Sequence, residues 1–233
     1  MTAFANFPYE VVEASGENAL ATWEELRNAG RGVPVVLGED NLDNLLLPFD
    51  PRERARQKSV EEILAMAEAI DFPDGLHKLR RDEHAAAVAY FKKMGSAADF
   101  GDEESEAPLG DWPAEPWCAS GLSVTYDFAT QRTKPTAHIA LIPSDDPTAI
   151  PAYMHWGNWN ECPPPAYHVA ALRAWRDHYG AELIASGPIR STCAYRAGPR
   201  HAKRPSTSLA HSTSIVTTSS IRASAPIGRW PPD

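Results

Sequence analysis

The hydrophobic patterning of this chain stops at Gly187, and that point limits how much of the chain can fold. From Pro188 to Asp233 the sequence is rich in Ser, Thr, Arg and Pro, with ten Ser or Thr among residues 206–220. Isolated apolar residues in such a tract bury too little area to offset an ordering cost of about 1–2 kcal/mol per residue. We therefore predict a folded body over residues 1–187 and a disordered or weakly extended tail over residues 188–233.

The net charge changes sign at the same point. Residues 1–187 carry 15 Lys and Arg against 30 Asp and Glu, whereas residues 188–233 carry seven cations and one acid, Asp233. An acidic body argues against nucleic acid as a partner, because phosphate binding needs clustered cations. The cations of the tail are spread thinly among Ser and Thr, so a nucleic-acid-binding arm is the weaker interpretation of that segment.

The sequence also predicts a cytoplasmic protein with no membrane partner. No apolar run reaches the roughly 18–20 residues that a membrane span requires. Residues Met1–Glu10 lack the basic and apolar regions of a secretory signal. The three cysteines, Cys118, Cys162 and Cys193, are too few and too scattered for a disulfide framework.

The first 38 residues have the pattern of a βαβ unit. Tyr9–Val12 predicts a strand, the apolar spacing over residues 20–30 predicts a helix that ends at Gly30, and Val33–Gly38 predicts a buried strand. The turn before the helix lacks the glycine-rich pattern that cradles phosphate. We therefore interpret this unit as scaffold.

A helical region is expected next. Ser59 and Glu62 form a capping box, and the helix that they open has one buried stripe, made of Val60, Ile63, Leu64 and Ala67. A further helix is predicted over Asp82–Met94, with its apolar centre at Ala85–Phe91 well buried. The charged segment Pro48–Lys58, which precedes both helices, is predicted to be a solvated loop.

The second half of the body begins after an acidic linker, residues 96–121, which lacks the ligand spacing of a calcium loop. Leu122–Phe128 and Thr136–Pro143 predict a hairpin whose second strand is central in a sheet. A helix is predicted over Pro163–Tyr179, followed by a strand that starts at Glu182.

The residues that follow position 152 carry the resemblance to a known family. They include Trp156-Gly157-Asn158-Trp159-Asn160, Cys162-Pro163-Pro164-Pro165, Tyr167-His168-Val169-Ala170, Leu172-Arg173 and Tyr179-Gly180-Ala181-Glu182-Leu183. This segment closely resembles the bacterial family called domain of unknown function 4253. The strand Pro34–Gly38 and residues 139–151 are similar to the region that precedes the domain in that family. The resemblance implies no established activity, cofactor or catalytic residue.

The resemblance ends near Gly187, where relatives continue with a further strand, a helix and an acidic motif of the form Y-C-x-D-I-[IV]-D-Q-G-V-G-T. Back-translation of residues 188–233 into a shifted frame permits codons for those elements in the family's order. We therefore hypothesise that an insertion or deletion near Gly187 replaced the original C-terminus with a frameshifted tail.

The candidate binding site is an aromatic and amide-rich corner. Its residues are Tyr153, Trp156, Asn158, Trp159, Asn160 and His168. Aromatic faces with amide donors and acceptors are typical of a ligand platform. The same residues could instead form a packed corner in which the tryptophans are buried, and this second interpretation is the one the composition favours.

The residues around Cys162 are compatible with two kinds of chemistry. Cys162 and His168 could be a nucleophile and its base, since a helix N-terminus lowers the pKa of a thiol. His155, Cys162 and His168 could be metal ligands, but their spacing fits no paired zinc motif. We predict no metal and no cofactor, and the sequence identifies no catalytic residue.

Together these patterns predict an α/β or α+β protein. An N-terminal βαβ and helical region (residues 1–95) and an acidic linker (96–121) precede a mixed-sheet module with a long helix (122–187), and a disordered, out-of-frame tail follows (188–233). The function that we expect is a non-enzymatic binding or interaction module for an unknown protein or small-molecule partner. The alternative is a hydrolase-like enzyme whose site needs the missing acidic motif.

Overall fold

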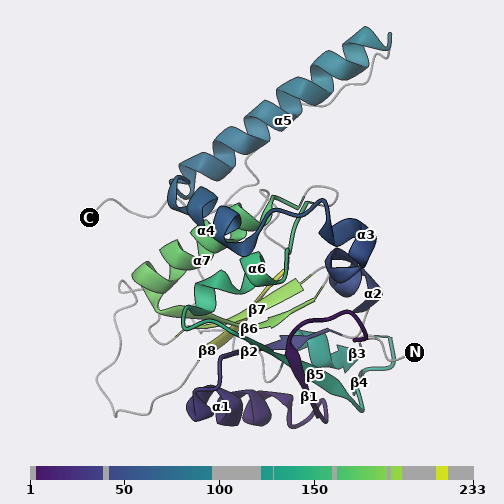
Figure 1. The fold of residues 1–233 in the computed structure, drawn as a ribbon, viewed down its shortest axis with the longest axis vertical. Coiled ribbons are helices and arrows are strands. Elements are labelled where there is room, and N and C mark those ends of the chain that lie inside the picture. Colours follow the sequence, from purple (N-terminus) through teal and green to yellow (C-terminus); the bar gives the residue numbers. More distant parts are fainter. Residues whose placement is uncertain are drawn as a thin grey trace.

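The fold is a six-stranded mixed sheet covered by helices on both faces (Figure 1). The computed structural model describes residues 4–38, 42–95, 122–127, 129–158, 162–187, 190–195 and 214–219. The sheet contains β1 (Glu10–Ala14), β2 (Val33–Leu37), β5 (Ala137–Ile142), β6 (Ala181–Ser186), β7 (Arg190–Tyr195) and β8 (Ser214–Ser219), in the order β1-β5-β2-β6-β7-β8. The predicted combination of helices and a mixed sheet is confirmed.

The predicted βαβ unit forms, but another strand separates its two strands. Both β1 and β2 pair antiparallel with β5, so β1 and β2 run parallel to each other with β5 between them. α1 (Ala19–Ala29) connects them and ends at Gly30, which has a left-handed conformation. β5 is thus a central strand, as its continuous apolar sequence predicted, and β2 continues the sheet through a parallel pairing with β6.

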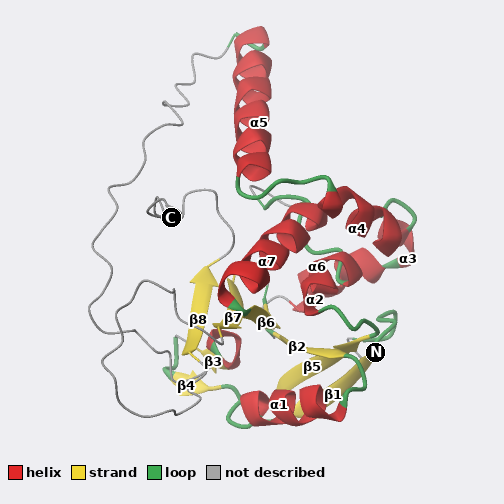
Figure 2. Cartoon of the chain, turned by 90° about the vertical axis from the view of Figure 1, so that its left-hand side faces the viewer, coloured by secondary structure: helices red, strands yellow, loops and turns green. Residues whose placement is uncertain are grey.

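α1 covers one face of the sheet and is fixed there by polar contacts as well as by packing (Figures 1 and 2). The indole of Trp23, 5% exposed, donates to the carbonyl oxygen of Pro34 at 2.7 Å. Arg27 forms an ion pair with Glu182 of β6 at 2.7 Å. The ring of Trp23 packs in a cluster with apolar side chains of the three central strands, including Val36, Ile139 and Ile184.

The opposite face carries the helices that build the candidate site (Figure 2). These are α2 (Leu42–Leu46), the 3₁₀ turn η1 (Leu47–Phe49), α3 (Pro51–Arg54), the 3₁₀ turn η3 (Pro147–Ala149), α6 (Ile150–Tyr153) and α7 (Pro165–Tyr179). Their buried side chains meet the sheet in one cluster, which contains Phe49, Ile150, Met154, Trp156 and Leu172. α7 ends at Gly180 in a left-handed conformation, close to the predicted end.

α4 (Val60–Glu68) forms an outer layer against α6 and α7. Ser59 accepts from the backbone N–H of Glu62, and the Glu62 carboxylate accepts in turn from the N–H of Ser59, so the predicted capping box is present. Ile63 and Ala67 are buried against Ala166 and Val169 of α7, with Val60 and Leu64 partly buried beside them. This arrangement confirms both the start of the helix and its buried stripe.

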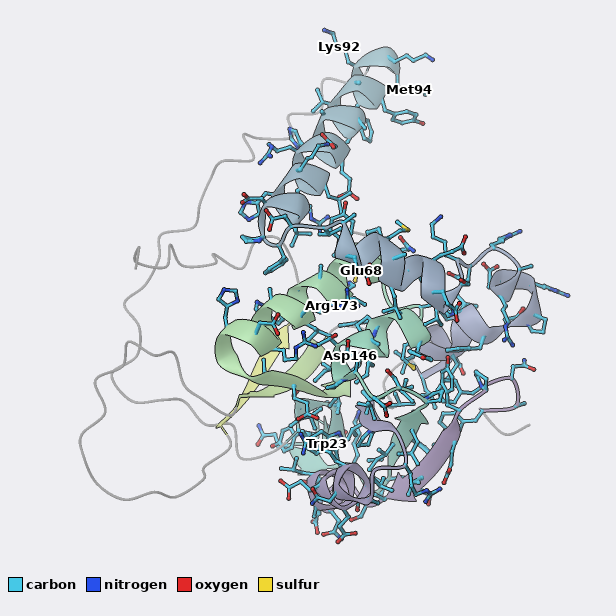
Figure 3. The ribbon with its side chains drawn as sticks, turned by 60° about the vertical axis from the view of Figure 1, so that its left-hand side comes forward. Trp23, Glu68, Lys92, Met94, Asp146 and Arg173 are labelled. Atoms are coloured by element: carbon cyan, nitrogen blue, oxygen red, sulfur yellow. The ribbon has the colours of Figure 1, made fainter. Side chains whose placement is uncertain are left out.

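The prediction of a well-buried third helix was wrong. α5 (Asp74–Lys93) begins eight residues before the predicted start and projects away from the body, with Lys92 and Met94 at its far end (Figure 3). Val88, Tyr90 and Met94 are 39%, 59% and 66% exposed, and Leu76 near the base is the buried residue of the helix. Apolar composition predicted burial, but a helix that leaves the body gives its outer turns no sheet or helix of the body to pack on.

One predicted loop and one predicted hairpin also differ from the structure. Pro48–Lys58 is not a solvated loop, because it contains η1 and α3 and buries Phe49 at 4% exposure. In the described part of Leu122–Phe128, the 3₁₀ turn η2 (Ser123–Thr125) is followed by the two-residue strand β3 (Tyr126–Asp127), which pairs with β4 (Arg132–Thr133). The hairpin is therefore this short ladder, while β5 pairs with β1 and β2.

Residues 188–233 were expected to be disordered or weakly extended. Within this range the structure describes two strands, β7 and β8, and the other residues lie outside the described ones. β7 pairs antiparallel with β6, so β6 has a strand on each side. Strand pairing uses backbone groups, which any sequence supplies. Within the described ranges, no helix combines the length and the hydropathy needed to cross a membrane.

Candidate functional site

Phe49 is the centre of an aromatic cluster that joins three separate parts of the chain. Its ring meets those of Phe7 and Tyr9 edge-on, with centroids 4.9 and 5.9 Å away. The imidazole of His155, from the segment after α6, approaches the same ring at 5.9 Å. The N-terminal segment, η1 and the end of α6 are thus held together by ring contacts, each typically worth about 0.5–1.5 kcal/mol beyond area burial.

A hollow of about 390 Å³ opens on the outer side of this cluster. It is lined by Asn6, Phe49, Pro51, Arg54 and Ala55. The lining combines one buried aromatic ring, two small apolar residues, an amide and a guanidinium. The hollow is largely open to solvent, so it would cover less of a ligand than the enclosed clefts of about 300–1,000 Å³ that are usual for small-molecule sites.

Arg54 is the charged residue among those that line the hollow, and its positive charge affects the pKa of two neighbouring side chains. The positive charge of Arg54 lowers the pKa of both Tyr9 and His155, although burial is the larger influence on each. Burial raises the pKa of Tyr9 to about 12, so this hydroxyl keeps its proton under ordinary conditions. It donates to the carbonyl oxygen of Tyr153 at 2.9 Å.

His155 contacts Phe49 and has an unusual backbone conformation. Its φ is 48°, in the left-handed region, which non-glycine residues adopt at a cost. Burial and the nearby Arg54 lower the pKa of His155, so the ring is neutral at pH 7. Its Nδ1 is buried and has no hydrogen-bond partner within the described residues. A neutral imidazole can supply either a donor or an acceptor there.

The structure places the candidate residues predicted from the sequence in different environments. Trp156 and His168 lie in the interior at 4% and 0% exposure, with their rings stacked at 4.5 Å and 26° between planes. Tyr153 is half-buried and its ring faces that of Tyr9, so it belongs to the aromatic cluster around Phe49 and not to the lining of the hollow. Asn158 is exposed, and Trp159 and Asn160 lie outside the described residues.

The segment that contains Asn158 is closed by backbone contacts. The N–H of Asn158 donates to the carbonyl oxygen of Pro163 at 3.3 Å, and Asn158 has a left-handed φ of 65°. Gly157 has a φ of 125°, and a Cβ at this position would lie 2.1 Å from the Pro163 oxygen. Only glycine fits both the conformation and the close approach.

Cys162 and His168 lie side by side, but their protonation states do not suit a nucleophile and its base. Nε2 of His168 is 3.3 Å from the Cys162 sulfur and 3.1 Å from the Pro163 carbonyl oxygen, which fixes a proton on Nε2. Burial raises the pKa of Cys162 to about 11 and lowers that of His168 to about 4. Both groups are therefore neutral at pH 7, whereas catalysis by a thiol requires the thiolate.

The described residues do not bring together three His, Cys, Asp or Glu side chains that could hold a metal ion. His155 and His168, two of the residues weighed as ligands, lie in different surroundings, the first against Phe49 and the second stacked on Trp156.

Sequence reasoning missed Phe49 and Arg54 because the segment that carries them looked like a charged loop. A signal was present: Asp50 followed by Pro51 is a helix start, with an acceptor at the cap and proline at the first turn. The Asp50 side chain does accept from the N–H of Arg52 at 2.9 Å. The burial of Phe49 depends on contacts with distant segments, which the local pattern does not encode.

Comparison with known proteins gives one match. Neither the curated proteins nor the solved structures compared with this chain gave a match. A family model, described as a domain of unknown function (DUF4253), matches from His138 in β5 through α6, α7, β6 and β7. The match continues past Gly187, where the resemblance read from the sequence had ended. Residues 138–211 of this chain therefore match the DUF4253 domain.

Proposed function

We propose that this protein is a non-enzymatic binding module and that its ligand is a small molecule seated in the hollow between the N-terminal segment and α3. The observation that carries the proposal is the combination of three apolar lining residues, Phe49, Pro51 and Ala55, with a guanidinium, Arg54. Apolar surface with a few placed polar groups is the usual composition of a ligand site. Tyr153, a candidate from the sequence, supports the hollow through its contact with Tyr9.

The state of the Cys162–His168 pair supports binding over catalysis. A neutral thiol beside a neutral, fully buried imidazole is suited to packing and hydrogen bonding. The stacking of His168 on Trp156 supports a structural role for these two candidates. No observation on the described residues favours the hydrolase-like alternative.

The test is a fragment screen by protein-observed NMR on the full chain, with neutral, anionic and cationic fragments in equal numbers. We expect fragments to shift resonances of residues around the hollow, such as Ala55 and Asn6, and to leave those of α1 unchanged. Binding elsewhere, or no binding in any charge class, would contradict the proposal. In parallel, turnover of generic ester, amide and phosphate substrates would count against a non-enzymatic role.

A matched pair of variants localises the binding. Ala55→Leu adds volume inside the hollow, whereas Ala29→Leu adds the same volume at the end of α1, on the other side of the sheet. We expect Ala55→Leu to abolish fragment binding with little change in stability, since Ala55 is exposed. Ala29→Leu should bind fragments as the unaltered protein does.

The frameshifted C-terminus stays a prediction from the sequence, and we propose it as the origin of residues 188–233. It predicts that a single-base correction near codon 187 restores the acidic family motif. Sequencing the gene from an independent template tests this directly. If the independent template gives the same reading frame, the tail does not come from a sequencing error. If the correction is found, the frame-restored protein would show whether the longer domain changes fragment binding.

A further inference from the structure

We infer that the ligand of the hollow is a small organic anion, with a carboxylate held by Arg54 and Asn6 and an apolar ring or short chain laid on Pro51 and Ala55, beside the edge of Phe49. This inference rests on the proposed function, because it names the chemical class that the same hollow would take. It is drawn from the charges, contacts and burial of the segment that runs from η1 through α3.

The first step is that Arg54 has no acidic partner among the residues that the structure describes. Within the described part of the chain Arg54 makes no ion pair, although two acids lie close to it in the sequence. The carboxylate of Asp50 caps α3 by accepting from the N–H of Arg52. Glu53 forms an ion pair with Arg56 at 3.3 Å. The local acids are thus already engaged, and the guanidinium of Arg54 is left for an external anion.

The second step is the local balance of charge. Residues 51–58 contain four cations and one acid, in a chain whose net charge is −9. None of the described residues that line the hollow is acidic. A hollow with a cationic wall on an otherwise acidic protein concentrates small anions, because the surrounding acids repel them from the remaining surface.

The third step is the apolar part of the lining, which a bare inorganic anion would not use. The ring of Phe49 is 4% exposed and held in place by Phe7, Tyr9 and His155. Pro51 and Ala55, which are both exposed, therefore supply most of the accessible apolar surface of the hollow. An anion that also carries an aromatic ring or a short aliphatic chain fits both parts of the lining.

The fourth step favours a carboxylate over a phosphate dianion. A planar carboxylate matches the two parallel N–H groups of a guanidinium, and the amide of Asn6 can donate a further hydrogen bond. The neutral ring of His155 adds no second positive charge beside Arg54. One cation balances one negative charge, so a dianion would remain partly unpaired in this hollow.

The experiment compares four probes by NMR titration of the full chain: benzoate, benzamide, phenyl phosphate and inorganic phosphate. Benzoate should bind at least tenfold more tightly than benzamide, its neutral counterpart of the same shape. It should also bind more tightly than phenyl phosphate and inorganic phosphate. Raising the salt concentration should weaken benzoate binding and leave any benzamide binding unchanged.

The matched variants are Arg54→Gln and Arg52→Gln, which remove one positive charge each from α3. Both side chains are exposed, so both variants should fold, and circular dichroism checks this. We expect Arg54→Gln to weaken benzoate binding at least tenfold and Arg52→Gln to change it by less than twofold. Equal losses in both variants would indicate general charge attraction and would overturn the assignment to Arg54.

The outcomes separate this inference from the proposed function. If benzamide binds in the hollow as tightly as benzoate, the anion inference fails while the hollow remains a binding site. If inorganic phosphate binds as tightly as benzoate, the apolar part of the ligand is wrong. If no probe and no fragment of any charge shifts resonances around the hollow, the proposed function fails as well.

Discussion

The hydroxyl of Tyr9 donates to the carbonyl oxygen of Tyr153 at 2.9 Å, across 144 positions of sequence. This bond joins the segment that enters β1 to the last residue of α6. It fixes the two sides of the aromatic cluster that supports the hollow, and the rings of the same two residues meet at 6.1 Å. The stability of the hollow should therefore depend on a contact that no local element supplies.

Replacing Tyr9 with Phe removes this donor and keeps the ring. We expect the free energy of unfolding to fall by about 1 kcal/mol, because the Tyr153 carbonyl loses a partly buried partner. Urea denaturation measures the change, and Tyr90→Phe on the exposed part of α5 is the matched control. An unchanged unfolding free energy for Tyr9→Phe would show that the bond contributes nothing to stability.

His168 predicts a loss of stability in mild acid. Its pKa is lowered from 6.5 to about 4 by burial, so the unfolded chain takes up a proton before the folded protein does. The contribution of the neutral His168 to the free energy of unfolding is complete well above pH 6.5. It falls as the pH drops through this range and levels off below about pH 4. The total loss from this group is about 3 kcal/mol.

Urea denaturation between pH 7 and pH 4 measures this slope. His168→Gln should show a shallower decrease over the same window, whereas His77→Gln, at an exposed position of α5, should follow the unaltered protein. If His168→Gln proves too unstable, an NMR titration of the His168 ring in the unaltered protein reports the pKa directly. A midpoint near 6.5 would contradict the prediction.

Cys162 should react slowly with alkylating reagents. Burial raises its pKa from 9.0 to about 11, which lowers the fraction of thiolate at pH 8 by roughly a hundredfold. Mass spectrometry of the peptide that contains Cys162 can follow alkylation by iodoacetamide in the folded protein and in urea. Equal rates in the two conditions would mean that the thiol is activated or accessible, and would favour the catalytic alternative.

Gly157 should tolerate no side chain. Gly157→Ala combines a φ of 125° with a Cβ placed 2.1 Å from the Pro163 carbonyl oxygen, so we expect a loss of at least about 2–3 kcal/mol in unfolding free energy. Gly95→Ala, at a φ of 70° with nothing within 4 Å, carries only the conformational cost of about 1–2 kcal/mol. Thermal and urea unfolding of both variants compare them. Similar losses would show that the loop yields to relieve the contact.

Local signals in the sequence determined several elements correctly. The capping box at Ser59, the left-handed glycines Gly30 and Gly180, and the apolar run of β5 each involve residues close together in the chain. The energy of such features depends on a few neighbouring dihedral angles and hydrogen bonds. They can therefore be read without knowing what the rest of the chain does.

Only the tertiary structure decided which strands, helices and side chains lie in contact with one another. β5 inserts between β1 and β2, α5 leaves the body with its apolar end exposed, and Trp156 stacks on His168 inside the core. The residues of the hollow come from two segments more than forty positions apart, Asn6 in one and Phe49–Ala55 in the other. The sequence marked the residues able to cap, stack or carry charge. Their contacts depend on packing between distant segments, and no local pattern specifies that packing.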